Sequence, residues 1–420
     1  MERKYWSPEV ETIPLDRLRK LQEERLKGVV AHAYEKTAFY RQRFDKAGVK
    51  PEDIKTLDDL KKFPLIHSSE DFRKAPVAER LGVPFSEVKY VESSSGTTGI
   101  PMVMLWSKRD WEDLQEGEAR ARWIAGVRPQ DRVHLLTGFP CCQGGHQKLG
   151  ATVIALSAGR GNLDNQIRVG EMAGVNVLEQ LPSLALKYFE RAKEMGIELG
   201  IRLVVSIGEG FAEAYRRKVE SEYGVQFRSV YGSVDAGLVA AECEAGDGMH
   251  LFGDLCLVEV IDPETLEVLS PGKEGELVLT LLWNEATPII RYRTGDVASL
   301  LPHQPCPCGR THPKMSLVKG RLSLSLKVKG KRIFPIDVEE VIVNIPGLGE
   351  EYQIIRDKPG ELDRLKVKVE AKPEVKDWEE MRKRVEQALN QNLGVESQVE
   401  LVPLGTFGRA LYKAQRIITT

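Results

Sequence analysis

The chain has 420 residues, more than one ordinary hydrophobic core accommodates, which predicts roughly two or three domains. A hydrophobic content of 42%, a charged content of 29% and a net charge of -2 are typical of a soluble globular protein and give no general case for a nucleic-acid or membrane partner. The charged start, the lack of any membrane-length apolar run and six cysteines without a disulfide pattern predict a cytoplasmic protein.

The opening segment, residues 1–65, predicts a small helical subdomain. Apolar residues recur at helical spacing from Leu15 to Tyr34, and Leu57 to Phe63 is a second short amphipathic piece. Thr37 to Tyr40 and Gly48 to Pro51 interrupt this pattern. We interpret the segment as a structural collar.

The middle of the chain alternates apolar strands with amphipathic helices, which predicts a mixed, mostly parallel α/β sheet. The expected strands are 132–136, 151–156, 175–178, 202–207 and 226–231, and the expected helices are 111–124, 166–172, 184–195 and 211–223. Ligands of such sheets bind at the carboxyl ends of strands. The loops expected at 139–146, 208–210 and 232–235 are therefore the candidate site.

Two further kinds of predicted structure follow along the chain. Strands expected at 255–261, 276–282 and 289–292 predict an antiparallel sheet or distorted β-barrel-like part. From residue 320, a hairpin through Lys329 and Gly330 and further elements predict a small α+β domain. Those elements are a helix at 338–343, strands at 351–356 and 365–371, and a helix at 378–390. The expected fold is α/β multidomain, with an N-terminal domain at 1–319 and a small mobile domain at 320–420.

A run of small hydroxyl and glycine residues spans Ser93 to Gly99. Glycine backbone and hydroxyl donors can surround anionic oxygens, so the run is a candidate phosphate cradle. No Gly-Lys-Ser/Thr closes it, so it is not a Walker A loop. Taken alone, its composition fits a flexible turn equally well.

Five motifs in order resemble those of the acyl-adenylating enzymes, which include acyl-CoA synthetases and peptide-synthetase adenylation domains. They are Ser93 to Pro101, Tyr231 to Asp235, Arg291 to Asp296, Gly320-Arg321 and Arg409 to Ala414. The short length and four other stretches resemble the phenylacetate–CoA ligase branch. These stretches are Thr37 to Tyr40, Gly48 to Ile54, Ser94 to Gly99, and Cys306 to Pro313. The resemblance covers essentially the whole chain.

The resemblance implies that a carboxylate attacks the α-phosphate of ATP to give acyl-AMP, after which CoA takes the acyl group. The implied phosphate cradle is Ser94, Ser95, Gly96, Thr97, Thr98 and Gly99. Thr97 and Lys413 are implied to be catalytic, with Lys413 bridging carboxylate and phosphate. Asp235 is implied to be catalytic as the ligand of Mg²⁺. As residues alone, Asp235 could be a turn aspartate and Lys413 a surface lysine.

The implied nucleotide contacts beyond the cradle are Glu209, Tyr231, Gly232, Ser233, Asp235, Asp296 and Arg321. Asp296 would accept the ribose hydroxyls, and Arg321 would assist near the ribose and phosphate. Glu209 would line the adenine pocket and Tyr231 would stack on the base. A buried strand-end aromatic is an equally good interpretation of Tyr231.

Three positions depart from the family pattern. Asp235 stands where glutamate is usual, Ile100 replaces the usual lysine after the phosphate cradle, and Ser323 replaces the usual hinge aspartate. A shorter carboxylate shifts the metal or binds it through water. These departures keep two alternatives open: an acid-adenylating enzyme without CoA transfer, and a non-catalytic nucleotide-binding protein.

Four residues offer a Cys₃His ligand set for structural zinc: Cys243, His250, Cys306 and Cys308. Relatives in this branch resemble the chain at all four positions. His312 is an alternative fourth ligand, and unpaired thiols are the alternative to a metal site. Cys141, Cys142 and Cys256 are expected to be apolar packing.

The acid pocket is expected between Phe139 and His146, with Gly208 to Phe211 nearby. Pro140, the adjacent cysteines and the paired glycines leave room for a flat, mostly apolar acid, and the resemblance implies an aromatic one. The expected partners are this acid, ATP and CoA, without nucleic acid or membrane. A homodimer is the assembly kept for testing.

Overall fold

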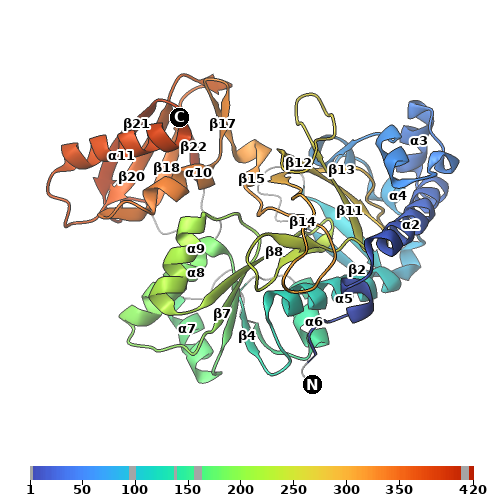
Figure 1. Cartoon of the computed structure of the whole chain (residues 1–420), viewed down its shortest axis with the longest axis horizontal. Helices are drawn as coiled ribbons and strands as arrows, with labels where there is room; N and C mark the ends of the chain where they lie inside the picture. The colour runs from blue at the N-terminus through green and yellow to red at the C-terminus, as the bar shows by residue number, and fades with distance from the viewer. Residues whose placement is uncertain (1–2, 94–100, 137–139, 156–162, 408–415) are drawn as a thin grey trace. The chain divides into compact units, whose positions relative to one another are not determined.

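The computed structural model describes residues 3–93, 101–136, 140–155, 163–407 and 416–420 (Figure 1). The chain forms two compact units. The first contains Met1–Glu179, Leu199–Gly208 and Arg228–Leu317, and the second contains Gln180–Glu198, Glu209–Phe227 and Val318–Thr420. None of the described helices is long and apolar enough to cross a membrane.

The first unit opens with the expected helices. They are α1 (Pro8–Glu11), α2 (Leu15–Lys36) and α3 (Ala38–Ala47), followed by the 3₁₀ turns η1 (Pro51–Asp53) and η2 (Leu57–Lys62). The break predicted over residues 37–40 is confined to Thr37, whose side chain accepts from the Tyr40 N–H and caps α3. Phe39 and Tyr40 are helical and fully buried, because α3 turns this aromatic face into the core.

Short elements connect this collar to the main sheet. They are β1 (Ile66–His67), η3 (Ser68–Phe72), α4 (Val77–Arg80), η4 (Phe85–Glu87), β2 (Val88–Ser93) and β3 (Val103–Ser107). β2 and β3 are antiparallel, with Ser93 opposite Val103. The Ser/Thr/Gly motif therefore begins where β2 ends.

The main sheet has eight strands in the order β14-β10-β9-β8-β7-β6-β4-β5. Their bounds are β4 (Arg132–Leu135), β5 (Thr152–Ala155), β6 (Val177–Gln180), β7 (Leu203–Ser206), β8 (Gln226–Ser233), β9 (Gly237–Glu242), β10 (Met249–Leu251) and β14 (Lys314–Met315). β4 is parallel to β5 and β6, whereas β8, β9, β10 and β14 pair antiparallel. The predicted mixed sheet is confirmed, but one half of it is antiparallel because the chain turns straight back from β8 into β9.

Helices α5 (Lys108–Ala125), α6 (Pro140–Leu149) and α7 (Leu163–Met172) belong to the first unit, as this sheet does, whereas α8 (Pro182–Glu194) and α9 (Glu213–Tyr223) belong to the second unit. The predicted loop over residues 139–146 is wrong for residues 140–146, which are helical. A Cβ at Gly144 would lie 2.0 Å from Gln115 Oε1, and one at Gly145 would lie 2.5 Å from Glu118 Cβ. These glycines therefore let α6 pack closely against α5, and that tertiary contact outweighs their low helix propensity.

A second sheet of the first unit has the path β1-β13-β12-β11. β11 (Cys256–Ile261), β12 (Glu274–Leu281) and β13 (Tyr292–Ser299) are antiparallel, and β1 runs parallel to β13. This is the part expected to resemble a barrel. The strand predicted over 289–292 starts only at Tyr292, because Arg291 has a φ of 45° that interrupts the extended backbone.

The C-terminal part of the second unit is α+β, as predicted. β15 (Gly320–Arg321) and η5 (Leu322–Leu324) precede β16 (Leu326–Val328), β17 (Lys331–Ile333), α10 (Pro335–Ile342), β18 (Leu348–Arg356), β19 (Glu361–Leu362), β20 (Leu365–Ala371), α11 (Trp378–Leu393), β21 (Ser397–Pro403) and β22 (Ile417–Thr419). Lys329 and Gly330 both have positive φ and form the predicted hairpin turn. α11 buries Val385, Leu389 and Leu393 in the core beneath the sheet β21-β20-β18-β22.

Candidate functional site

Two carboxylates implied to bind the nucleotide are each held by a tyrosine. The Tyr292 hydroxyl donates to Asp235 Oδ2 at 2.6 Å, and the Tyr231 hydroxyl donates to Asp296 Oδ2 at 3.0 Å. Asp235 follows β8, whereas Tyr292 and Asp296 lie on β13. The fold thus brings together, within the first unit, two motifs that are about sixty residues apart in sequence.

Tyr292 is 1% exposed, and burial together with the nearby Asp235 charge raises its pKa well above the ordinary value. It therefore remains a hydroxyl donor at neutral pH. A donor fixed in this way orients the Asp235 carboxylate. In the sequence, Tyr292 stands out only as part of the motif Arg291 to Asp296, and no pattern pairs it with Asp235.

Tyr231 is only 8% exposed and its hydroxyl is used by Asp296. Its buried position two residues before the end of β8 is close to the interpretation as a buried strand-end aromatic, and stacking on a base stays a prediction. Gly232 pairs with Leu238 and Ser233 with Gly237 across the β8–β9 turn. A Cβ at Gly232 would lie 2.2 Å from the Gly237 carbonyl oxygen, so close strand approach requires this glycine.

The second unit contains Glu209 and Arg321. Glu209 Oε2 accepts from the Ser183 hydroxyl at 2.7 Å and lies 3.4 Å from the Ser183 N–H. It thereby caps the start of α8, because the N-cap residue Leu181 has no side-chain acceptor. Arg321 is exposed in β15. Glu209 has a structural task in addition to the role that its motif implies.

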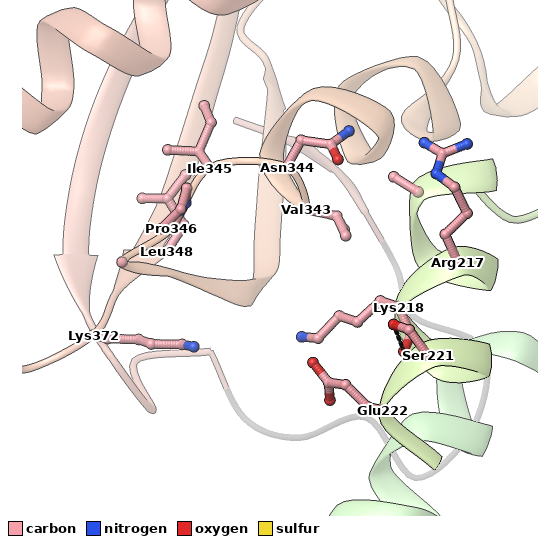
Figure 2. Close-up of a pocket in the computed structure, with 12 residues that line it drawn as sticks. Arg217, Lys218, Ser221, Glu222, Val343, Asn344, Ile345, Pro346, Leu348 and Lys372 are labelled. Atoms are coloured by element: carbon pink, nitrogen blue, oxygen red, sulfur yellow. Dashed lines mark hydrogen bonds between the residues drawn. The ribbon is translucent and has the colours of Figure 1, made fainter. Parts of the chain in front are cut away.

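A cavity of about 500 Å³ also lies in the second unit, between α9 and the turn at 343–348 (Figure 2). Lys218 and Lys372 extend into it from opposite sides, and Glu222 lies beside Lys218. Lys218 forms an ion pair with Glu350. None of the described members of the predicted acid pocket, residues 140–146 and 208–211, lines this cavity.

Several predicted site residues lie outside the part of the chain that the structure describes. They are Ser94, Ser95, Gly96, Thr97, Thr98, Gly99, Phe139 and Lys413, together with Ile100. Their roles therefore stay predictions.

The four predicted zinc ligands, Cys243, His250, Cys306 and Cys308, converge in the first unit. Their ligand atoms all lie within 4.8 Å of one another, with Cys243 Sγ 3.7 Å from Cys306 Sγ and Cys308 Sγ 3.3 Å from His250 Nε2. Tetrahedral zinc with Zn–S bonds of about 2.3 Å places two sulfurs about 3.8 Å apart. The donor set and spacing fit zinc, although the two cysteine-bearing segments are far apart in sequence.

The surroundings of the cluster select His250 as the nitrogen ligand. Its Nδ1 lies 3.3 Å from the His312 carbonyl oxygen, which favours a proton on Nδ1 and leaves Nε2 for a metal. His312 lies outside the cluster, because its Nδ1 is 2.9 Å from the Leu251 carbonyl and its Nε2 is 2.9 Å from the Val10 carbonyl. Two hydrogen bonds lower the pKa of the Cys308 thiol: the larger effect comes from Cys243 and a smaller one from His250.

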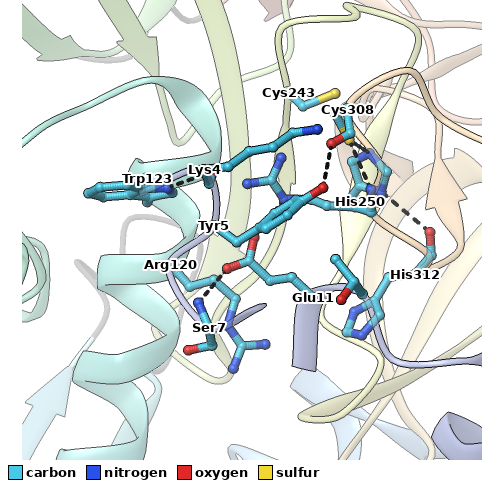
Figure 3. Close-up of polar contacts among 12 residues, drawn as sticks. Lys4, Tyr5, Ser7, Glu11, Arg120, Trp123, Cys243, His250, Cys308 and His312 are labelled. Carbon is cyan, nitrogen blue, oxygen red and sulfur yellow. Dashed lines mark hydrogen bonds and ion pairs between the residues drawn. The ribbon is translucent and has the colours of Figure 1, made fainter. Parts of the chain in front are cut away.

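Residues 3–13, here called the N-terminal strap, cover the cluster (Figure 3). The Tyr5 hydroxyl donates to the Cys308 carbonyl at 3.1 Å, and Arg310 Nε donates to Glu11 Oε2 at 2.7 Å. Arg310 and Glu11 are both at least nine-tenths buried. The strap therefore closes the loop that carries Cys306 and Cys308. No periodicity or motif in the sequence indicated this contact.

Comparison with known proteins places these features in a family. A family model for the AMP-binding enzyme C-terminal domain matches residues 330–420. The chain is 36% identical to a phenylacetate–coenzyme A ligase of Thermus thermophilus, over 96% of this chain and 97% of that protein. It is 34% identical to the phenylacetate–coenzyme A ligase of Escherichia coli, over 97% and 96%. The chain belongs to the phenylacetate–coenzyme A ligase family.

A solved structure supports the same assignment. The crystal structure of 2-hydroxyisobutyryl-CoA ligase in the postadenylation state, in complex with R3-HIB-AMP, aligns with a TM-score of 0.92 at 25% identity, covering 100% of this chain and 93% of that one. As a member of the phenylacetate–coenzyme A ligase family, the chain is an ATP-dependent, AMP-forming acid–CoA ligase.

Proposed function

We propose that the chain joins ATP to an aromatic, phenylacetate-like acid, forms acyl-AMP and pyrophosphate, and transfers the acyl group to CoA. The pair of tyrosine-held carboxylates at Asp235 and Asp296 is the observation that carries this proposal. The relatives at 36% and 34% sequence identity are phenylacetate–coenzyme A ligases, which favours an aromatic acid as the substrate of this chain.

The two reacting groups are both anionic, so positive charge and hydrogen-bond donors must surround them. Asp235 would hold Mg²⁺, which when bound neutralises phosphate charge, and Tyr292 orients that carboxylate. Asp296 would hold the ribose, and the Ser94–Gly99 run would hold the phosphates. Lys413 would place its ammonium between carboxylate and phosphate.

We propose that residues 1–319 form the adenylate-forming domain and residues 320–420 form a separate small domain. The smaller part would act as a mobile lid that exchanges one set of groups for another between the two half-reactions. The match of residues 330–420 to the C-terminal domain of AMP-binding enzymes supports this boundary. Ser323, in the turn η5, stands at the hinge position.

Structural zinc at Cys243, His250, Cys306 and Cys308 is part of the proposal. The 3.7 Å sulfur separation and the Nδ1 contact of His250 support it. Metal analysis of the purified protein should give about one zinc per chain. A value near zero would exclude the site.

The deciding experiment measures ATP–pyrophosphate exchange with a panel of carboxylic acids, followed by thioester formation with CoA. Exchange should be fastest with arylacetates and should lead to an aryl-CoA. No exchange with any acid would leave the non-catalytic alternative. Exchange without thioester would favour an acid-adenylating enzyme, the alternative that Ser323 keeps open. Light scattering of the same preparation tests the proposed homodimer.

A further inference from the structure

A second group of possible metal ligands lies apart from the zinc cluster, at the contact between α5 and α6. It consists of Cys141 and Cys142 in the first turn of α6 and Glu118 on α5. The two sulfur atoms and a carboxylate oxygen lie within 4.8 Å of one another. From the sequence both cysteines are expected to be apolar packing, and nothing in the proposed reaction uses their sulfur.

The packing of the two helices holds this group together. A Cβ at Gly145 would lie 2.5 Å from Glu118 Cβ, so α6 approaches α5 as closely as glycine allows. Cys142 is 3% exposed and Glu118 is 1% exposed, whereas Cys141 is half-buried. The donors are therefore positioned by rigid elements, and Cys141 leaves a route from solvent.

A fourth donor, the carboxylate oxygen of Glu92, reaches Cys141 from β2. The Cys141 thiol lies 3.5 Å from Glu92 Oε1, and Glu92 is 6% exposed. Glu118 has Arg122 as an ion-pair partner, but no lysine, arginine or histidine forms an ion pair with Glu92 among the residues that the structure covers. The buried Glu92 carboxyl beside the Cys141 thiol thus has no ion-pair partner among the described residues.

We propose that Cys141, Cys142, Glu118 and Glu92 form a binding site for a thiophilic divalent cation such as Zn²⁺. Thiolate sulfur and carboxylate oxygen are both established ligands of this ion. On binding, each thiol loses its proton to solvent and the cation supplies the charge that Glu92 lacks. Arg122 stays paired with Glu118 and orients it.

The site differs in strength from the zinc cluster. It groups two thiols with the Glu118 carboxylate, which is already paired with Arg122, and Glu92 joins only through its contact with Cys141, whereas the zinc cluster has three thiols and an imidazole. Carboxylates are the harder ligands, so this site should fill only after the zinc cluster is full. Cys141 and Cys142 also lie in the segment expected to line the acid pocket. If the proposed function holds, the bound cation would therefore slow acid activation.

The test counts metal in the full-length protein. The protein is kept reduced with a non-thiol reductant, equilibrated with excess Zn²⁺ and desalted, and metal per chain is measured. We expect about two zinc ions for the wild type and about one for Cys141→Ser/Cys142→Ser. Cys256→Ser removes a buried cysteine that belongs to neither group and should keep about two.

A wild-type count of one, or an equal count in the double variant and the wild type, would overturn the proposal. The zinc retained in the Cys243 cluster and an unchanged circular dichroism spectrum show that the double variant has folded. Should it fail to fold, Glu92→Gln keeps both thiols and should weaken Cd²⁺ binding at this site about tenfold, and unchanged affinity would exclude Glu92. The metal count does not require turnover, so its outcome is independent of the proposed reaction.

Discussion

At the scale of single residues, the most informative contact is the hydrogen bond from the Tyr292 hydroxyl on β13 to the Asp235 carboxylate, which follows β8. The Asp235 carboxylate is one methylene shorter than the glutamate usual in the family. The Tyr292 hydroxyl, 2.6 Å from Oδ2, fixes the direction in which that shorter side chain presents its charge. Orientation by a second residue is therefore expected to matter more here than side-chain reach.

Tyr292→Phe should lower pyrophosphate exchange about tenfold at limiting Mg²⁺, because a hydrogen bond to a charged group contributes about 1.5–3 kcal/mol. Excess Mg²⁺ should restore part of the rate. The measurement is exchange as a function of Mg²⁺ concentration. Tyr34→Phe, which removes a hydroxyl bound to Asp45 on the surface, is the matched control. An unchanged Mg²⁺ dependence would contradict the positioning role of Tyr292.

Lys413→Ala should reduce pyrophosphate exchange at least about a hundredfold, because the ammonium offsets repulsion between the two reacting anions. Thioester formation from supplied acyl-AMP should stay within about twofold of the wild type. Lys383→Ala, an exposed lysine on α11, serves as the control. Equal loss of both half-reactions would argue against the bridging role.

Site residues could be predicted from the sequence by type but not by partner. Asp296 and Asp235 stood out because their motifs resemble a family. Their tyrosine partners did not, since each hydrogen bond joins segments about sixty residues apart. The convergence of Cys243, His250, Cys306 and Cys308 could be predicted because Cys and His suit a metal site and the family resemblance covers all four positions, whereas the N-terminal strap that covers them had no comparable signal.

At the scale of elements, α8 and α9 take their N-terminal caps from other segments. Their N-cap residues, Leu181 and Ala212, provide no side-chain acceptor. For α9, Glu339 accepts from the Ala212 N–H at 3.1 Å and Glu340 from the Ala214 N–H at 2.9 Å. Both carboxylates belong to α10. A movement of residues 320–420 away from α9 would uncap that helix.

Glu340→Ala removes a cap of α9 and the ion pair with Arg217. A lost cap costs about 1 kcal/mol, so we expect adenylation to slow about fivefold if the capped arrangement serves that half-reaction. Thioester formation from supplied acyl-AMP should not slow. The ratio of the two half-reaction rates is the measurement. Glu400→Ala breaks a comparable ion pair between β20 and β21 and should leave the ratio unchanged. An equal fall in both rates would rule out a selective role.

Strongly periodic elements were predictable, and elements decided by packing were not. α11 and the hairpin at Lys329-Gly330 appear where apolar spacing and turn chemistry predict them. Helix α6 was not predicted, because Gly144 and Gly145 are typical of a loop in the sequence. Their role in the close packing of α6 against α5 is visible only in the structure. The late start of β13 likewise depends on the backbone of Arg291, which composition does not specify.

For the whole molecule, the buried His134 of β4 makes the free energy of unfolding depend on pH. Burial lowers the pKa of His134 from the ordinary histidine value of about 6.5 to about 4. As pH falls through this window the unfolded chain takes up a proton before the folded chain does, so stability is lost. The stability that comes from neutral His134 is fully present above the pKa of this histidine in the unfolded chain, and it is lost as the pH falls to its pKa in the folded chain.

We expect His134 to cost the folded state about 2 kcal/mol between about pH 7.5 and about pH 5. His134→Gln cannot take up this proton, so the difference in unfolding free energy between wild type and variant should change by that amount. Chemical denaturation at the two pH values measures it. His303→Gln, an exposed histidine, should show no such change. A pH-independent difference for His134→Gln would contradict the assigned burial cost.

The N-terminal strap has a consequence for how the protein is made. Glu11 and Arg310 are separated by 299 positions, and the strap also contacts Cys308 and His312. During translation the strap emerges from the ribosome early and must wait for its partners while nearly three-quarters of the chain is synthesised. Its docking can therefore only be a late event, and a chaperone that shields residues 3–13 of the nascent chain would act before the loop with Cys306 and Cys308 has been synthesised.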